Sequence, residues 1–263
     1  MIGQLYYTIL YEPIFNALIG IYHILPWKDF GVAIILVTLG IKIILYFPSL
    51  SSIKSQRALQ EIQPKLDAIR EKYKNEKEKM SQELMKFYKE NKVNPFSSCL
   101  PLLIQFPILI ALYRVFIGGL TLDPATGILV PDQLQYLYDG LRSIYDHTPL
   151  STMFLGFIDM SRSKNVVLAV LAAGFQFWQA RMLEKRKPKV KTEGAKDEAL
   201  AANINRQMMY LFPLMTLYFG YVFPAGLTLY WLVSTLFTIA QQYYIFKKHP
   251  VKTDAPLPTP QVH

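Results

Sequence analysis

Several features that would support an enzymatic or redox function are missing from this chain of 263 residues. Cys99 is the only cysteine, which excludes an internal disulfide and leaves no CxxC or Cys/His cluster to hold a metal ion. The sequence also has no HExxH, GxSxG or P-loop motif and no carboxylate pair spaced for catalysis. We therefore expect no catalytic residue, no metal and no cofactor.

Charged residues are scarce as well, at 18% of the chain against 52% hydrophobic residues. They gather in a few runs that separate long apolar stretches, which is typical of a polytopic membrane protein. The net charge of +9 is also found in nucleic-acid-binding proteins, but Lys and Arg accumulate in the cytoplasmic loops of membrane proteins too. We expect membrane lipid as a partner and no specific nucleic-acid sequence.

Five apolar stretches approach the ~20 residues that a helix needs to cross ~30 Å of hydrocarbon. Pro224 and Gly226 divide the last long run, which is too long for one crossing, into two. The sequence therefore predicts an all-α polytopic membrane protein whose transmembrane helices lie at about 30–47, 98–116, 166–182, 208–222 and 225–246.

Residues 1–28 are apolar but interrupted by Glu12 and Pro13, and apolar positions repeat at helical spacing from Pro13 to Leu25. We interpret them as an amphipathic helix lying in the membrane interface, with a sixth spanning helix as the alternative. The N-terminus lacks a basic stretch followed by an early small-residue cleavage site, so we expect no cleavable secretion signal.

The polar stretch 51–94 holds eleven basic and seven acidic residues. Pro64 is suited to begin a helix, because the first helical turn needs no N–H, and residues 74–76 are suited to a turn. We predict a helical hairpin outside the membrane that ends at Pro95.

The basic residues are divided unequally between the two sides of the predicted helices. Twenty-two Lys and Arg lie in or beside the hairpin, the loop 183–206 and the tail 249–263, whereas four lie on the side of the loop 119–165. Lys and Arg mark the cytoplasmic side, so we predict an external N-terminus, an external 119–165 loop and a cytoplasmic C-terminus.

Lys42 lies inside an apolar run, about 18 Å from Phe30 at ~1.5 Å per helical residue. A lysine at the centre of a bilayer costs about 3 kcal/mol and normally faces protein or a watery cavity. The alternative is that its long side chain reaches the cytoplasmic headgroups.

Other polar groups recur at the same depth, and none of the predicted spans contains Asp or Glu to pair with Lys42. Inter-helix hydrogen bonding accounts for each of these groups singly, but together they favour a shared hydrated groove that captures an anion transiently. They include Thr38, Gln105, Gln176, Gln179 and Ser234.

Several segments, in the right order, resemble the YidC-type insertase family over about residues 10–248. They are GVAIILVTLGIKIILYFPSL at 31–50, IQPKL at 62–66, NPFSSCLPLLIQFPILIALYRVF at 94–116, FLGFIDMS at 154–161 and FPAGLTLYWLVSTLFTIAQQ at 223–242.

The resemblance implies a five-helix core around a hydrophilic groove that is open to the cytoplasm and to lipid. It implies a function as a membrane insertase and chaperone in the bacterial plasma membrane, which moves hydrophobic segments of nascent membrane proteins into the bilayer without ATP. It also implies action alone or beside the Sec translocon. We expect the hairpin to receive clients or ribosomes, with a hairpin that only braces the core as the alternative. The basic tail is a topology signal or a contact for ribosomal RNA or anionic lipid.

Lys42 falls where the family usually has the groove arginine, so the chain departs from the family here. Arg is always charged and can form two parallel hydrogen bonds to one carboxylate, whereas Lys is a point charge. The chain resembles a minimal version of the family, without the large extracytoplasmic domain or the lipoprotein signal of other members. Groove or client-contact positions are matched by Thr38, Gln105, Phe106, Pro107, Tyr230 and Trp231, and with less certain spacing by Gln176 and Gln179.

Two other functions stay open at this point. The same groove could serve a small-solute transporter or channel, which solute flux without client protein would reveal. A membrane protein assembly factor without insertion activity is the other alternative.

Overall fold

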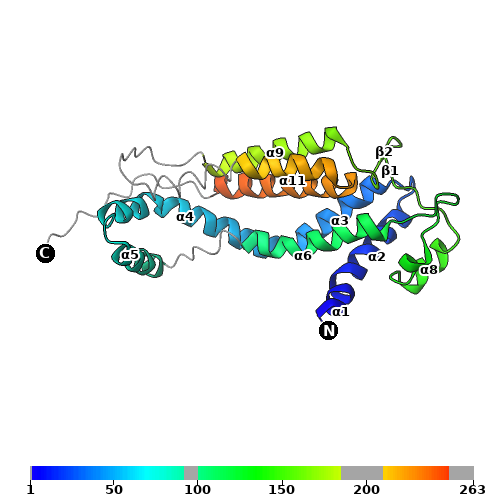
Figure 1. Ribbon diagram of the computed structural model, residues 1–263, viewed down its shortest axis with the longest axis horizontal. Helices are drawn as coiled ribbons and strands as arrows, with labels where there is room; N and C mark the ends of the chain where they lie inside the picture. The colour runs from blue at the N-terminus through cyan, green and yellow to red at the C-terminus, as the bar shows by residue number, and fades with distance from the viewer. Residues whose placement is uncertain (1, 92–99, 185–209, 249–263) are drawn as a thin grey trace.

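The computed structural model describes residues 2–91, 100–184 and 210–248 (Figure 1). The described chain is mostly helical and carries one antiparallel sheet of two short strands, which agrees with the predicted all-α class. The end of the predicted hairpin, most of the predicted loop 183–206 and the tail 249–263 lie outside the described residues.

The N-terminal segment is helical from Ile2 to Ile24, so the helix extends beyond the stretch 13–25 in which the apolar positions repeat. It consists of α1 (Ile2–Tyr6), a π-helical turn η1 (Tyr7–Tyr11) and α2 (Glu12–Ile24). Pro13 is tolerated because it occupies the first turn of α2, where no N–H is required. One side of α2 is buried against the next helix, so this segment covers part of the core.

The next helix, α3 (Phe30–Ile44), begins at an N-cap whose carboxylate oxygen Asp29 Oδ1 accepts a hydrogen bond from Val32 N at 2.9 Å. It ends earlier than the predicted span, and the chain then bends by 67° into α4 (Tyr46–Lys72). The prediction that a helix begins at Pro64 is wrong, because α4 runs through that proline. A proline removes one backbone hydrogen bond, and a helix of 27 residues keeps the others.

α4 is followed by a short turn and by α5 (Lys77–Glu90), and the two helices contact each other. The turn includes Lys74 and Asn75, where the sequence predicted it. The helical hairpin is therefore present, but its first helix begins before residue 51.

A long connection follows α6 (Leu100–Arg114) and its π-helical end η3 (Val115–Gly119). It holds two short helices and a β-hairpin in which Met153 pairs with Asp159 and Phe154 with Ile158. These elements are α7 (Pro131–Leu134), α8 (Asp139–Tyr145), β1 (Met153–Phe154) and β2 (Ile158–Asp159).

The last three helices are α9 (Val166–Glu184), the helix Tyr210–Val222 and α11 (Ala225–Lys248). α11 packs against both α3 and α9, and Figure 1 shows it beside α9 along their length. The break before α11 is held by the preceding loop, because Ala225 N donates to Arg162 O and Gly226 N donates to Met160 O, each at 2.8 Å.

Taken singly, none of the described helices has both the length and the mean hydropathy that a bilayer crossing requires. α3 and the first part of α4, as far as Leu59, meet the requirement together as a bent pair. Three shorter helices are apolar, namely Ile104–Gly118, Val166–Met182 and Tyr210–Val222.

The β-hairpin and α8 lie at one end of the elongated molecule, and α5 lies at the other (Figure 1). We call the end that carries residues 120–165 the loop end and the end that carries α4 and α5 the hairpin end.

Candidate functional site

The structure joins two of the predicted site residues, which come from α6 and α11. The amide of Gln105 donates a hydrogen bond to the hydroxyl of Tyr230, whose side chain is buried. Phe106, the next residue along α6, is 57% exposed and points out of the packed core. Pro107 lies inside α6 and deprives it of one backbone hydrogen bond. A polar pair therefore lies beside a locally weakened, partly exposed stretch of α6.

Thr38 and Lys42 lie one turn apart on α3 but in different surroundings. Thr38 is buried, and its hydroxyl donates to Ile34 O at 2.6 Å, so the helix itself satisfies it. Lys42 is partly exposed, and Ile43 and Ile44 beside it are exposed. Of these two, Lys42 is the side chain available to a ligand.

The charge of Lys42 has no counter-ion among the described residues, because no described carboxylate lies within ion-pair distance of its amine. Lys42 does lie in the last turn of α3, which ends at Ile44. The unpaired carbonyls at a helix C-terminus carry partial negative charge and favour a cation. The bend after α3 therefore supplies an electrostatic contribution that the sequence, with its longer predicted span, did not indicate.

The remaining predicted residues lie on α9 and α11. Thr216 Oγ1 donates to Gln176 Oε1 at 2.6 Å and ties the helix Tyr210–Val222 to α9. Gln179 is half-buried one turn further along α9. Trp231 is half-buried on α11, and Ser234 is buried. Since α11 packs against both α3 and α9, these residues and Lys42 belong to one bundle, but among the described residues no hydrogen bond joins the Gln176 pair to Lys42.

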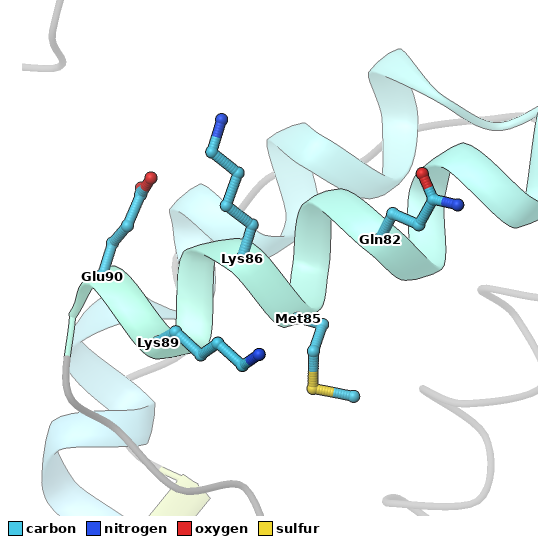
Figure 2. Close-up of a pocket in the computed structure, with 5 residues that line it drawn as sticks. All are labelled: Gln82, Met85, Lys86, Lys89 and Glu90. Atoms are coloured by element: carbon cyan, nitrogen blue, oxygen red, sulfur yellow. The ribbon is translucent and has the colours of Figure 1, made fainter.

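Two shallow depressions lie on the described surface away from Lys42, which lines neither of them. One lies on α5, and Figure 2 shows that all five lining side chains come from that helix, with Lys86 and Glu90 on one side and Met85 and Lys89 on the other. The other lies at the loop end, between β2 and the start of α9. A hydrated groove around Lys42 stays a prediction.

The structure shows one buried charged residue, Arg57, that the sequence analysis did not single out. Arg57 on α4 is buried against the end of α11: its Nη1 donates to Ile245 O at 3.4 Å and its guanidinium lies 5.2 Å from the ring centre of Phe246. Its Nε also donates to Glu61 Oε1 at 3.4 Å. In the sequence Arg57 was one of eleven basic residues of a polar stretch, and no local pattern marked it for burial.

At the contact between α4 and α11, several buried polar atoms have no hydrogen-bond partner among the described residues. Ser49 Oγ donates to Gln241 Oε1 at 2.9 Å, but Arg57 Nη2, Gln241 Nε2 and Gln242 Oε1 have no such partner in the described part of the chain. An unsatisfied buried polar group costs roughly 1–3 kcal/mol. This junction therefore holds α4 in place less firmly than its burial suggests.

At the loop end the polar groups are better matched. Asp159 Oδ1 accepts hydrogen bonds from the Thr152 and Ser161 hydroxyls, each at 2.7 Å, and Arg162 Nε lies 3.0 Å from Asp159 Oδ2. Burial alone would raise the pKa of Asp159, but the hydrogen bonds and the Arg162 charge outweigh burial and hold that pKa below its usual range.

The family described as 60 kDa inner membrane protein matches residues 21–253 of the chain. A "Membrane protein insertase YidC" of Fusobacterium nucleatum is 36% identical over 220 residues, which cover 84% of this chain and 87% of that protein. Proteins of the same name from Streptomyces avermitilis and Syntrophobacter fumaroxidans are 33% and 36% identical. The matches cover 84% and 85% of this chain but only 52% and 36% of those two longer proteins.

Proposed function

Because the chain belongs to the 60 kDa inner membrane protein family, we propose that it is a membrane protein insertase, which moves hydrophobic segments of client proteins from the cytoplasm into the bilayer. The relative from Fusobacterium nucleatum supports this function, since it carries the insertase name and aligns over most of both chains. The structural observation that carries the mechanism is Lys42, a partly exposed cation without a counter-ion among the described residues.

The proposed placement in the membrane has five spanning segments, with the loop end outside and the hairpin end in the cytoplasm. Its support is the distribution of Lys and Arg, twenty-two on the hairpin side and four on the loop side. The hairpin, α4 and α5, then stands where a nascent client arrives, and its basic residues are the proposed contact for the ribosome. Action beside the Sec translocon belongs to the same proposal.

The energetic problem that an insertase solves lies in the polar flank of its client. Transfer of the client's apolar helix into lipid is favourable by roughly 25 cal/mol per Å² of buried apolar area. The charges beside that helix are expensive at bilayer depth. A cation at Lys42 offers an acidic flank a transient partner, and a membrane potential that is positive outside adds about 2.3 kcal/mol per charge per 100 mV.

The proposed groove places Lys42 with Thr38 on α3, Gln105, Phe106 and Pro107 on α6, Gln176 and Gln179 on α9, and Tyr230, Trp231 and Ser234 on α11. The Gln105–Tyr230 hydrogen bond supports this arrangement, because it brings α6 to α11, the helix that packs against α3.

Substitution of Lys42 tests the mechanism. In liposomes that contain the purified protein, Lys42→Ala and Lys42→Glu should slow the insertion of a client with an acidic translocated segment, with the larger loss in Lys42→Glu. Lys42→Arg should insert that client at close to the unsubstituted rate, because it keeps the positive charge. A client with a neutral segment is the control, and equal insertion of the acidic client by all variants would disprove the capture role.

A further inference from the structure

The tip of the β-hairpin at the loop end exposes large apolar side chains. Leu155 is 60% exposed and Phe157 is 73% exposed, and Gly156 lies between them. Leu155 has a φ of 52°, in the left-handed region that a leucine adopts only at a cost of about 1 kcal/mol or more. The turn geometry by itself therefore does not favour an apolar residue at this tip.

The tip is fixed to the start of α3. Leu155 N donates to Asp29 Oδ2 at 2.7 Å, and the other oxygen of the same carboxylate caps α3. The Phe154 ring covers Gly31 so closely that a Cβ there would lie 2.2 Å from ring atoms. The exposed side chains are therefore presented from a firmly attached hairpin.

Beside the tip lies a depression of about 350 Å³ with an apolar wall and a basic rim. Arg162 is largely exposed, and the amine of Lys164 has no ion-pair partner among the described residues. Asp159 also lines the depression, and its carboxylate pairs with Arg162 and accepts from two hydroxyls, so the net positive charge of the rim comes from Lys164. The lining residues are Met153, Phe157, Ile158, Asp159, Arg162, Ser163, Lys164 and Asn165.

The depression adjoins an apolar surface of α9. Val166, Val167 and Val170 are 57%, 66% and 54% exposed, and Lys164 lies two residues before Val166 in the chain. In the proposed placement this surface of α9 faces lipid. The basic rim then lies at the level where lipid phosphates meet acyl chains, which is where Lys and Arg find anionic headgroups.

We propose that this depression binds an anionic phospholipid of the leaflet at the loop end. Its phosphate lies at Lys164 and Arg162, and its glycerol and upper acyl carbons lie against Phe157 and Met153. The proposal rests on the proposed membrane placement. Lipid is the occupant that fits, because the apolar wall continues into the exposed face of α9 and the rim is basic.

Spin labels report the depth of the tip in the full chain. In a Cys99→Ser background, single cysteines at Phe157, Val170 and Ala125 are labelled in phosphatidylcholine–phosphatidylglycerol vesicles. Collisions with oxygen and with a water-soluble nickel chelate are then compared. The Phe157 label should favour oxygen over nickel severalfold more than the label at exposed Ala125, and Val170 should favour oxygen most.

Each result decides one question. A Phe157 label that behaves like Ala125, beside a Val170 label at acyl depth, overturns the lipid site and leaves a protein as the occupant of the tip. A Val170 label in water overturns the membrane placement, and the lipid site with it. Neither result changes the insertion assay on Lys42, so failure of the proposed function stays distinguishable.

A second experiment varies the charge of the lipid. Replacing phosphatidylcholine vesicles by vesicles with phosphatidylglycerol should immobilise the Phe157 label, and Lys164→Gln should abolish this difference. Lys28→Gln is the matched control, because Lys28 is exposed at the same end but does not line the depression. Equal effects of the two substitutions, or no effect of phosphatidylglycerol, would contradict a defined lipid site.

Discussion

Two buried amides show how the ends of this molecule differ. Asn16, at the loop end, donates to Tyr136 O at 2.8 Å and accepts from Tyr138 N at 2.7 Å, so α2 and the long loop are joined through one satisfied side chain. Gln242, at the hairpin end, is 2% exposed, and its Oε1 has no hydrogen-bond partner within residues 2–91, 100–184 and 210–248. A buried side-chain amide thus finds hydrogen-bond partners at the loop end and lacks one at the hairpin end.

The difference extends beyond these two residues. At the loop end Asp29 and Asp159 each accept two or more hydrogen bonds. At the hairpin end Arg57 and Gln241 are buried, and each has a nitrogen without a partner in the part of the chain that the structure describes. Well-matched polar networks rigidify a structure, and poorly matched ones lower the local free energy of opening. We infer that the loop end is the rigid part of the protein and that α4 leaves α11 more readily at the hairpin end.

The largest expected effect separates the two amides directly. Asn16→Leu should lower the free energy of unfolding by about 3 kcal/mol, because it removes the hydrogen bonds of Asn16 to Glu12 O, Tyr136 O and Tyr138 N, each contributing about 1 kcal/mol. Gln242→Met should change it little or increase it, because it removes an unsatisfied acceptor while keeping the volume. Thermal unfolding in detergent, followed by intrinsic fluorescence, measures both. A larger loss for Gln242→Met would reverse the comparison.

Two glycines of α3 sharpen the comparison within one helix. Gly31→Ala should destabilise the protein by about 2 kcal/mol, since the new Cβ displaces Phe154 and the hairpin with it. Gly40→Ala is the control towards the hairpin end, where a Cβ meets nothing within 4 Å, and it should be neutral or slightly stabilising. The same thermal measurement applies, and equal losses would show that the Phe154 contact contributes nothing.

The smallest expected effect is a pH dependence confined to the loop end. The pKa of Asp159 is lower in the folded chain than the ordinary value near ~4, so its stabilisation is complete above that value and is lost as pH falls through the folded pKa. Unfolding temperatures from pH 6 down to pH 3 should therefore converge for the unsubstituted protein and Asp159→Asn. A constant difference across this range would contradict the assignment.

Much of the architecture could be predicted from hydropathy, because the five predicted spans each coincide with a described helix to within a few residues. Their crossing of a membrane stays a proposal. The start at Pro64 failed because a single proline is a weak helix signal in a helix as long as α4. The 67° bend after α3 was not predicted, although Pro48 in the first turn of α4 is a sequence signal for it. The ring of a proline clashes with the carbonyl four residues earlier, which here belongs to Ile44.

Some features of the candidate site could likewise be predicted from the sequence, and others could not. Lys42 could be found from the sequence alone, because a charge in an apolar run is conspicuous whatever surrounds it. The hydrogen bond from Gln105 to Tyr230 joins residues far apart in the chain, and only packing brings them together. Arg57 escaped notice because ten other basic residues share its stretch and only one face of α4 meets α11.

The sequence by itself determined the helical class, the family and the position of Lys42 in an apolar run, since each depends on local composition or on order along the chain. Tertiary structure decided which polar groups find partners. It joined Asn16 to the long loop and Leu155 to Asp29, and it left Arg57 and Gln242 incompletely satisfied. The physical reason is that a hydrogen bond requires donor and acceptor within about 3 Å, a condition that residues distant in sequence meet only after the helices have packed.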